Sequence, residues 1–411
     1  MTQQRQENQQ SPGSRQAHLS PLVALSNVLL TSWATMLAAR GHQFAEVAGY
    51  AVGVSAVVVG AVAFGGGTTL KYLTGDIHTR LAIRRVRLFL VAPGLIITSL
   101  AAGLIYGATT DLVAVAVILG GITATGNNLS ELESADLKRE ERIVLLLLTN
   151  IASRSLAVLI LFAGGTFSVA MACAAISGFA ALRILTTSQR KMERSETLSI
   201  WESIRKSYNR HLIAITLLDV VIMRVPFVVA PILASPQTAG AFAVLLSAQQ
   251  GVGTLVTTGI QTVMAIRAKK PIKAVLIRMR RLERQLVALS VAIAFVGAAL
   301  TPIVVRFLNV ETFPHVETWW LLLMAALPLM ALNRATELWL LACDQELEAA
   351  KLLGIIALVI LAYCGFTLWR LDIAEMGAFA VISESVGVAA VAVLWLRRSH
   401  SRQPGDAQPE R

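Results

Sequence analysis

The chain has 411 residues, of which 55% are hydrophobic and only 15% charged, and its mean hydropathy is +0.65. This composition excludes an ordinary soluble domain, in which about 25% of the residues are charged. A helix needs about 20 apolar residues to cross the hydrocarbon layer, and such stretches recur along nearly the whole chain. The sequence therefore predicts an all-α polytopic membrane protein.

Twelve transmembrane helices are predicted, with short charged or Gly/Pro-containing breaks between them. In chain order they cover residues 20–39, 47–70, 84–107, 112–130, 143–163, 166–186, 211–233, 238–264, 286–307, 318–342, 348–369 and 373–396. They divide into two six-helix lobes with polar segments at the ends and between them. These five parts are a disordered cytoplasmic tail at 1–19, an N-terminal lobe at 20–187, a linker at 188–210, a C-terminal lobe at 211–396 and a cytoplasmic tail at 397–411. The first helix is expected to be retained, because no signal-peptide cleavage site follows it.

Lysine and arginine cluster in four alternate loops, which predicts that these loops are cytoplasmic. The clusters lie at 71–87, 138–142, 190–210 and 267–284, whereas the opposite loops hold only Arg40, Arg306 and Arg370. Both termini are then cytoplasmic and the protein lies in the inner membrane. The net charge of +11 follows from this topology, so nucleic acid is not an expected partner. Trp319 and Trp320, at the outer end of the tenth helix, are expected to anchor it at the membrane interface.

Two basic segments between helices have amphipathic character. TLSIWESIRKSYNRH, at 197–211, spaces Leu198, Trp201 and Ile204 three residues apart among Arg and Lys, as in an interfacial helix. The segment at 268–285 is similar. We expect both to lie on the inner leaflet and to bind anionic membrane lipids.

One phrase occurs twice in the chain. AGYAVGVSA at 48–56 returns as GAFAVLLSA at 240–248, and the two copies lie near the starts of the second and eighth helices. Six helices separate them, so the two lobes are predicted to be parallel repeats with a substrate path between them. The alternative is a chance recurrence in a chain rich in Ala and Val.

Several stretches resemble the polysaccharide flippases of the multidrug/oligosaccharidyl-lipid/polysaccharide (MOP) exporter superfamily. These flippases have an aromatic-glycine-aromatic turn, a helix that ends in glycines, and an acidic residue in the helix that opens the second half. The matching stretches are GHQFAEVAGYAVGVSAVVVGAVAFGGG, LLDVVIMRV, SPQTAGAFAVLLSAQQ, ALNRATELWLLACDQELEAAKLLGIIALVI and MGAFAVISESVG. The resemblance implies alternating-access transfer of a lipid-linked glycan to the outer leaflet. Enzymes of polysaccharide assembly are then candidate partners for the basic segments.

Arginines within predicted helices are the first candidates for a binding site, because ionisable groups at mid-membrane usually face a partner or a water-filled space. Arg154 lies in the fifth helix with Asn150 one turn earlier, and Arg224 lies in the seventh. Arginine suits a pyrophosphate head group, so both are cavity candidates. The alternative is a buried ion pair, either Arg224 with Asp219 or Arg154 with Glu384.

Acidic residues in the same helices have two open roles. Asp219 in the seventh helix and Glu384 in the twelfth are candidates either for coupling to H⁺ or Na⁺ or for structural ion pairs. Glu337 follows Arg334 by three residues in the tenth helix, which predicts a pair on one helical face.

A polar stripe follows one face of the eighth helix. It consists of Ser247, Gln250, Thr254, Thr257 and Gln261. Lipid would disfavour such a stripe, so it is expected to face the helix bundle. There it either binds sugar hydroxyls or makes hydrogen bonds between helices.

Other chemistry has little support in the sequence. There is no P-loop motif, the three cysteines lack metal or disulfide spacing, and the six histidines form no metal-spaced pair. We therefore expect no cofactor, no metal and no enzymatic activity. Two alternative functions stay open besides the flippase: a drug or metabolite exporter of the same superfamily or of the major facilitator type, and a membrane scaffold that does not transport.

Overall fold

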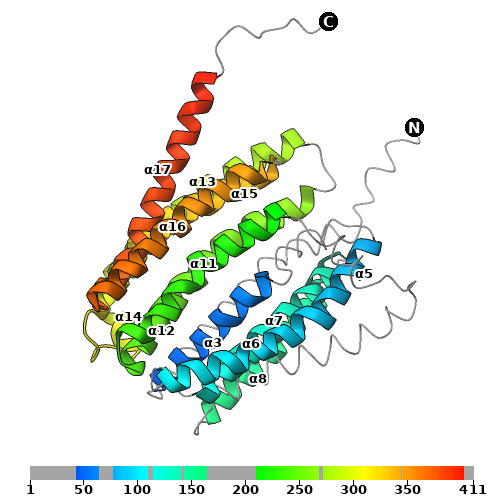
Figure 1. The fold of residues 1–411 in the computed structure, drawn as a ribbon. Helices are drawn as coiled ribbons and strands as arrows, with labels where there is room; N and C mark the ends of the chain where they lie inside the picture. The colour runs from blue at the N-terminus through cyan, green and yellow to red at the C-terminus, as the bar shows by residue number, and fades with distance from the viewer. Residues whose placement is uncertain are drawn as a thin grey trace, which may run out of the picture.

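The computed structural model describes residues 43–63, 77–109, 114–139, 143–163, 210–267, 272–343 and 345–401. All regular secondary structure in these ranges is helical. The predicted first and sixth helices, the tail at 1–19 and almost all of the linker lie outside the described residues. The helices form two groups that lie side by side, blue to cyan and green to red in Figure 1.

The N-terminal group contains the second to fifth predicted helices. The third predicted helix starts earlier than predicted, and a single turn of π-helix, η2, interrupts it. The elements are α3 (Phe44–Ala63), α5 (Ile77–Val86), η2 (Arg87–Val91), α6 (Ala92–Thr109), α7 (Ala114–Arg139) and α8 (Ile143–Ala163).

The C-terminal group contains the seventh to twelfth predicted helices. The elements are α11 (Arg210–Leu233), α12 (Pro236–Arg267), α13 (Ile272–Ala299), α14 (Thr301–Phe307), α15 (Val316–Ala342), α16 (Glu346–Arg370), η3 (Ala374–Gly377) and α17 (Ala378–Ser401). These bounds agree with the predicted helices within a few residues, except at α13 and α14.

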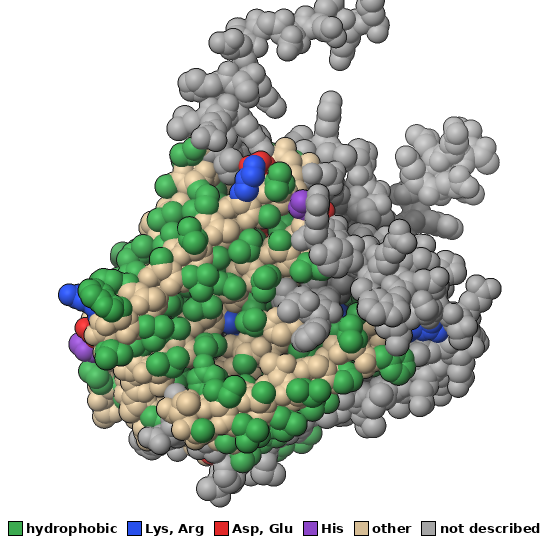
Figure 2. All heavy atoms as spheres, viewed as in Figure 1, with side chains coloured by type: hydrophobic (Ala, Val, Ile, Leu, Met, Phe, Trp, Pro, Cys, Tyr) green, Lys and Arg blue, Asp and Glu red, His purple; other side chains and the backbone are tan. Residues whose placement is uncertain are grey.

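Within the described part of the chain, five helices are long and apolar enough to cross a membrane, or six if the bent pair α13 and α14 is counted as one span. Large apolar side chains cover most of the face shown in Figure 2, and most of its charged groups lie toward the edges. Leu104 and Phe295, for example, are exposed on the outside of the bundle. Such a surface is stable against lipid tails but not against water, so the molecule is a membrane protein.

The predicted ninth helix is bent instead of straight. α13 and α14 meet at an angle of 74° beside Leu300. Pro302 explains the bend, because it has no backbone N–H to donate to the carbonyl of Ala298. The hydroxyl of Thr301 donates to that oxygen instead, at 2.6 Å.

Two groups of basic residues lie within helices. Arg84 and Arg87 belong to the basic cluster at 71–87 and also to the predicted third helix, and both are buried within the helix formed by α5, η2 and α6. Arg84 pairs with Asp136 of α7 at 3.1 Å, and Arg87 contacts Glu131 at 3.3 Å. Opposite charges on α7 compensate these arginines, so the helix continues through them. The segment at 268–285 is also not a separate interfacial helix, because α13 runs from Ile272 directly into the apolar span.

The expected interfacial anchors are also wrong. Trp319 and Trp320 are almost fully buried instead of lying at the membrane surface. Their indole N–H groups donate to the backbone oxygens of Ala374 and Gly297, at 3.1 and 2.8 Å. Because these bonds satisfy the polar end of each ring, the whole side chain can enter the core. The ring of Phe242 packs edge-on against Trp319 at 5.3 Å.

Glycines bring α3 and α7 into backbone contact. A Cβ atom at Gly53 of α3 would overlap the carbonyl of Val117, and one at Gly120 of α7 would overlap the carbonyl of Tyr50. Only glycine permits two helices to approach so closely. α3 is therefore fastened along its length to the N-terminal group.

Candidate functional site

Helix α3 lies between the two groups of helices. Besides α7, it packs against α11 and α12 of the C-terminal group. The two copies of the repeated phrase begin in α3 and α12, and these helices meet near their first turns, where Gly240 packs on the backbone of Phe44. The two copies of the repeated sequence thus lie on opposite sides of one interface between the lobes.

Both predicted cavity arginines lie within electrostatic range of helix α3. Arg154 of α8 and Arg224 of α11 are each half-buried, although they belong to different lobes. Tyr50 of α3 influences both guanidinium groups. Tyr50 thus has one arginine of each lobe in its electrostatic surroundings, which the sequence could not predict because hydropathy does not fix the rotation of a helix.

Arg224 forms no ion pair with any described acidic residue. No hydrogen bond to its guanidinium is formed in the described part of the chain, and its Cζ atom lies 5.8 Å from the ring centroid of Phe227. The alternative pair of Arg224 with Asp219 is not formed, because Asp219 binds Arg334 instead. Arg224 is therefore a half-buried cation next to the lobe interface.

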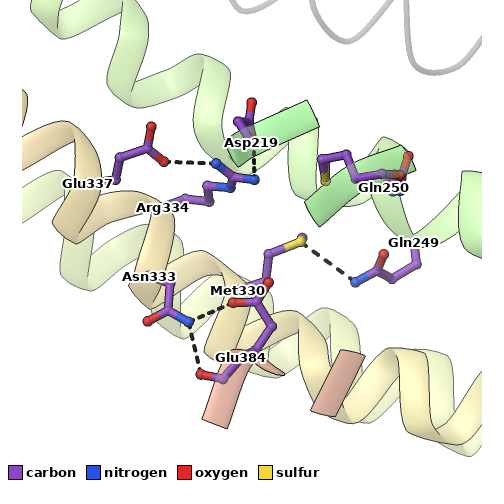
Figure 3. Close-up of polar contacts among 9 residues, drawn as sticks. Asp219, Gln249, Gln250, Met330, Asn333, Arg334, Glu337 and Glu384 are labelled. Atoms are coloured by element: carbon purple, nitrogen blue, oxygen red, sulfur yellow. Dashed lines mark hydrogen bonds and ion pairs between the residues drawn. The ribbon is translucent and has the colours of Figure 1, made fainter. Parts of the chain in front are cut away.

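A second polar cluster lies inside the C-terminal lobe (Figure 3). Arg334 of α15 forms ion pairs with Asp219 of α11 and with Glu337, whose Oε2 atom lies 2.8 Å from its Nη1 atom. The predicted same-face pair of Arg334 and Glu337 is thus present. The side chain of Asp219 is 40% exposed, whereas those of Arg334 and Glu337 are 10% exposed. Asp219 is therefore the most exposed of these three residues.

Glu384 of α17 lies beside this cluster and is held by an amide instead of an arginine. Asn333 donates through Nδ2 to the Glu384 carboxylate at 2.6 Å and to its backbone oxygen at 2.9 Å. The alternative pair of Arg154 with Glu384 is not formed. A Cβ atom at Gly387 would lie 2.5 Å from the same Nδ2 atom, so the glycine leaves the space that Asn333 occupies.

The polar stripe of α12 is described only in part. Gln250 donates through Nε2 to the backbone oxygen of Met223 at 2.8 Å, which is a bond between helices within the lobe. The preceding residue, Gln249, is buried and donates to the sulfur of Met330 at 3.7 Å. The side chains of Asn150, Thr254, Thr257 and Gln261 lie outside the described residues, so their roles stay predictions.

Two residues of these sites, Asn333 and Tyr50, were not predicted, and Arg334 was predicted only as the partner of Glu337. Asn333 and Arg334 adjoin each other in the sequence ALNRATE, and two strongly polar residues in an apolar helix shortly before an acidic one are a sufficient signal. Tyr50 aligns with Phe242 in the repeated phrase. Phe242, in the second copy, is buried in the core. Tyr50, in the first copy, has an additional hydroxyl group, and this difference could have indicated a polar role for Tyr50.

Comparison by sequence gives no relatives: no protein-family model matches the chain, and no curated protein sequence matches it.

Comparison by structure gives several solved transporters. The chain is similar to the MATE multidrug transporter DinF-BH, solved in complex with a ligand, with a TM-score of 0.57 and 12% identity over 95% of this chain and 97% of that one. It is also similar to the inward-facing conformation of a multidrug resistance MATE family transporter of the MOP superfamily, with a TM-score of 0.54 and 14% identity over 93% and 94% of the chains. The eukaryotic MATE transporter AtDTX14 gives a TM-score of 0.53, 14% identity and the same coverage.

These similarities extend over almost the whole chain and define its fold. The described part of the chain has the all-α, two-lobe fold of these solved transporters, as the sequence predicted. Identities of 12 to 14% define a fold and not a substrate.

Proposed function

We propose that the protein is a flippase that moves a lipid-linked oligosaccharide or polysaccharide precursor from the inner to the outer leaflet of the cytoplasmic membrane by alternating access. The observation that supports this best is Arg224, a half-buried guanidinium next to the lobe interface that forms no ion pair with the acidic residues of the described ranges. The fold supports a path between two lobes, and the lobes of such transporters rock around a central site.

The charge of the site favours an anionic substrate. An unpaired arginine inside a membrane protein costs free energy unless an anion or water compensates it. A pyrophosphate offers several acceptor oxygens and two or more negative charges, which Arg224 and Arg154 can bind together with the hydroxyl of Tyr50. A cationic substrate would be repelled by the same two arginines.

The cluster around Arg334 supports ion coupling. Asp219, Glu337 and Glu384 lie near a single guanidinium, so two negative charges are left over when all three carboxylates are ionised. A buried set of charges is not stable in that state, and uptake of H⁺ or Na⁺ would neutralise it. We propose Asp219 as the entry point, because its side chain is the most exposed of those around Arg334.

A binding measurement tests the substrate. Full-length protein in nanodiscs is titrated with undecaprenyl pyrophosphate, and Arg224→Gln is expected to weaken binding by about 10- to 100-fold, the value of a charge-assisted hydrogen bond. Arg306→Gln is the matched control, because Arg306 is exposed on α14. Equal affinity of Arg224→Gln and the unsubstituted protein would contradict the proposal. In the same titration, Asp219→Asn is expected to abolish any dependence of affinity on pH or Na⁺, and an unchanged dependence would exclude the coupling role.

A drug exporter is the second candidate, because two of the structural neighbours are described as multidrug transporters. Efflux of ethidium, a cationic fluorescent drug, from cells that express the protein distinguishes the two functions. Ethidium efflux that persists in Arg224→Gln would favour the exporter, whereas the flippase proposal predicts that expression of the protein does not increase ethidium efflux.

A further inference from the structure

At one end of the molecule, five residues make contacts between the two lobes, and we name them the lobe seal: Phe44, Tyr106, Val228, Gly240 and Phe313. The rings of Phe44 and Phe313 are in edge-to-face contact, with centroids 4.9 Å apart. The hydroxyl of Tyr106, on α6, donates to the backbone oxygen of Val228, on α11, at 3.3 Å. Each of these contacts joins the N-terminal lobe to the C-terminal lobe.

Gly240 makes the tightest contact of the seal. A Cβ atom there would overlap the carbonyl of Phe44 and lie 2.8 Å from its Cα atom. Because the obstructing atoms are backbone, no change of rotamer can relieve the overlap, and any side chain would push α3 and α12 apart. The equivalent position in the first copy of the repeated phrase is Ala48, so the two copies differ at the point of contact.

All five residues lie at helix ends that the predicted topology places outside. They belong to the start of α3, the end of α6, the last turns of α11, the start of α12 and the loop after α14. In Figure 1 the starts of α3 and α12 lie at the lower end of the molecule, opposite the end of α17. The C-terminal tail that follows α17 is predicted to be cytoplasmic, which agrees with an outward position for the seal.

The lobe seal is one end of a longer interface between α3 and the C-terminal lobe. α3 is in backbone contact with α7 at Gly53 and Gly120, and among the described residues the seal contains an aromatic pair, a hydrogen bond of 3.3 Å and the backbone contact at Gly240. Opening of the seal by a rigid-body motion of the lobes would also separate α3 from α11 and α12, against which it packs.

We propose that the lobe seal is the outer gate of the transport path and that the absence of a side chain at Gly240 is what allows it to close. The gate rests on the proposed transport function, but it does not depend on which substrate is carried. A larger residue at position 240 is expected to shift the population toward an outward-open state.

Thiol labelling tests the gate without a substrate. Cys173, Cys343 and Cys364 are replaced by alanine, and Tyr50→Cys is introduced as a reporter about 9 Å deeper than Phe44, six residues along α3. Intact cells are treated with a membrane-impermeant maleimide. Gly240→Leu is expected to raise the labelling rate of the reporter by about tenfold. Gly365→Leu is the matched control, because no atom lies within 4 Å of a Cβ at that glycine.

Two further variants keep the test decisive. Phe313→Ala removes half of the aromatic pair without adding bulk, and it is expected to raise labelling even if Gly240→Leu does not reach the membrane. Ser235→Cys, in the exposed turn between α11 and α12, must react in intact cells if the seal faces outward. The proposal is overturned if Gly240→Leu and Phe313→Ala both leave labelling unchanged, or if Ser235→Cys reacts only in inverted vesicles. Labelling that behaves as expected, combined with unchanged binding by Arg224→Gln, would reject the proposed substrate and retain the gate.

Discussion

Two arginines near the middle of the C-terminal lobe differ in what compensates their charge. Arg334 is bound by Asp219 and Glu337, whereas Arg224, on the same helix as Asp219, forms no ion pair with a described carboxylate. The ion pairs of Arg334 fix the packing of α15 against α11. An arginine outside such a pair is available for an external anion, which is why Arg224 and not Arg334 is proposed to bind substrate.

At this scale the account predicts that Arg334→Ala is strongly destabilising. Removing the guanidinium leaves buried carboxylates without a partner, at a cost of about 3–5 kcal/mol. Lys351→Ala is the control, because the Lys351–Glu348 pair has a similar distance of 2.8 Å but lies largely in solvent, where such pairs contribute about 0–1 kcal/mol. Thermal unfolding of both variants in detergent, followed by tryptophan fluorescence, compares them. Similar melting temperatures for the two would contradict the structural role of Arg334.

Helix α3 connects the two lobes, because it packs against α7 of one and against α11 and α12 of the other. Its glycine contacts with α7 make it part of the N-terminal lobe, and its first turn and Tyr50 face the C-terminal lobe. A helix held in this way transmits movement of one lobe directly to the site and to the lobe seal.

Substitutions at two glycines of α3 are expected to differ in sign. Gly53→Ala places a methyl group on the backbone of Val117 and is expected to cost about 1–3 kcal/mol. Gly60→Ala places it 3.5 Å from Thr98 Oγ1, an ordinary contact, so the gain in helix propensity of about 0.5–1 kcal/mol should remain. The melting temperature of each variant measures the difference, and equal destabilisation by both would show that α3 and α7 do not approach as described.

Helix positions were predictable from hydropathy because a membrane span is a long apolar run, whatever it packs against. α8 and α11 agree with prediction to within a residue. Features that depend on a partner were not predictable. The burial of Trp319 requires the backbone oxygen of Ala374, and the burial of Arg84 requires Asp136, more than 50 residues away in both cases. The bend at Leu300 could have been predicted from the presence of Pro302 in the sequence.

For the whole molecule, the repeated phrase predicted two parallel lobes, and the structure and its neighbours confirm an all-α fold with two lobes. The candidate site was predictable only as a set of residue types. Arg154 and Arg224 could be selected as intramembrane cations, but their place in the electrostatic surroundings of Tyr50 depends on the rotation of α8, α11 and α3. The lobe seal could not be predicted from the composition of either lobe, because it depends on how closely Gly240 packs against Phe44.

The central claim is that arginines between the lobes guide an anionic lipid-linked glycan across the membrane. Its most direct test is the distribution of that glycan between the two leaflets in native cells that carry the unsubstituted protein, Arg154→Ala or Arg224→Ala at matched membrane levels. The account predicts that the glycan accumulates on the cytoplasmic leaflet with either substitution. An unchanged distribution in both variants and in a complete deletion would contradict it.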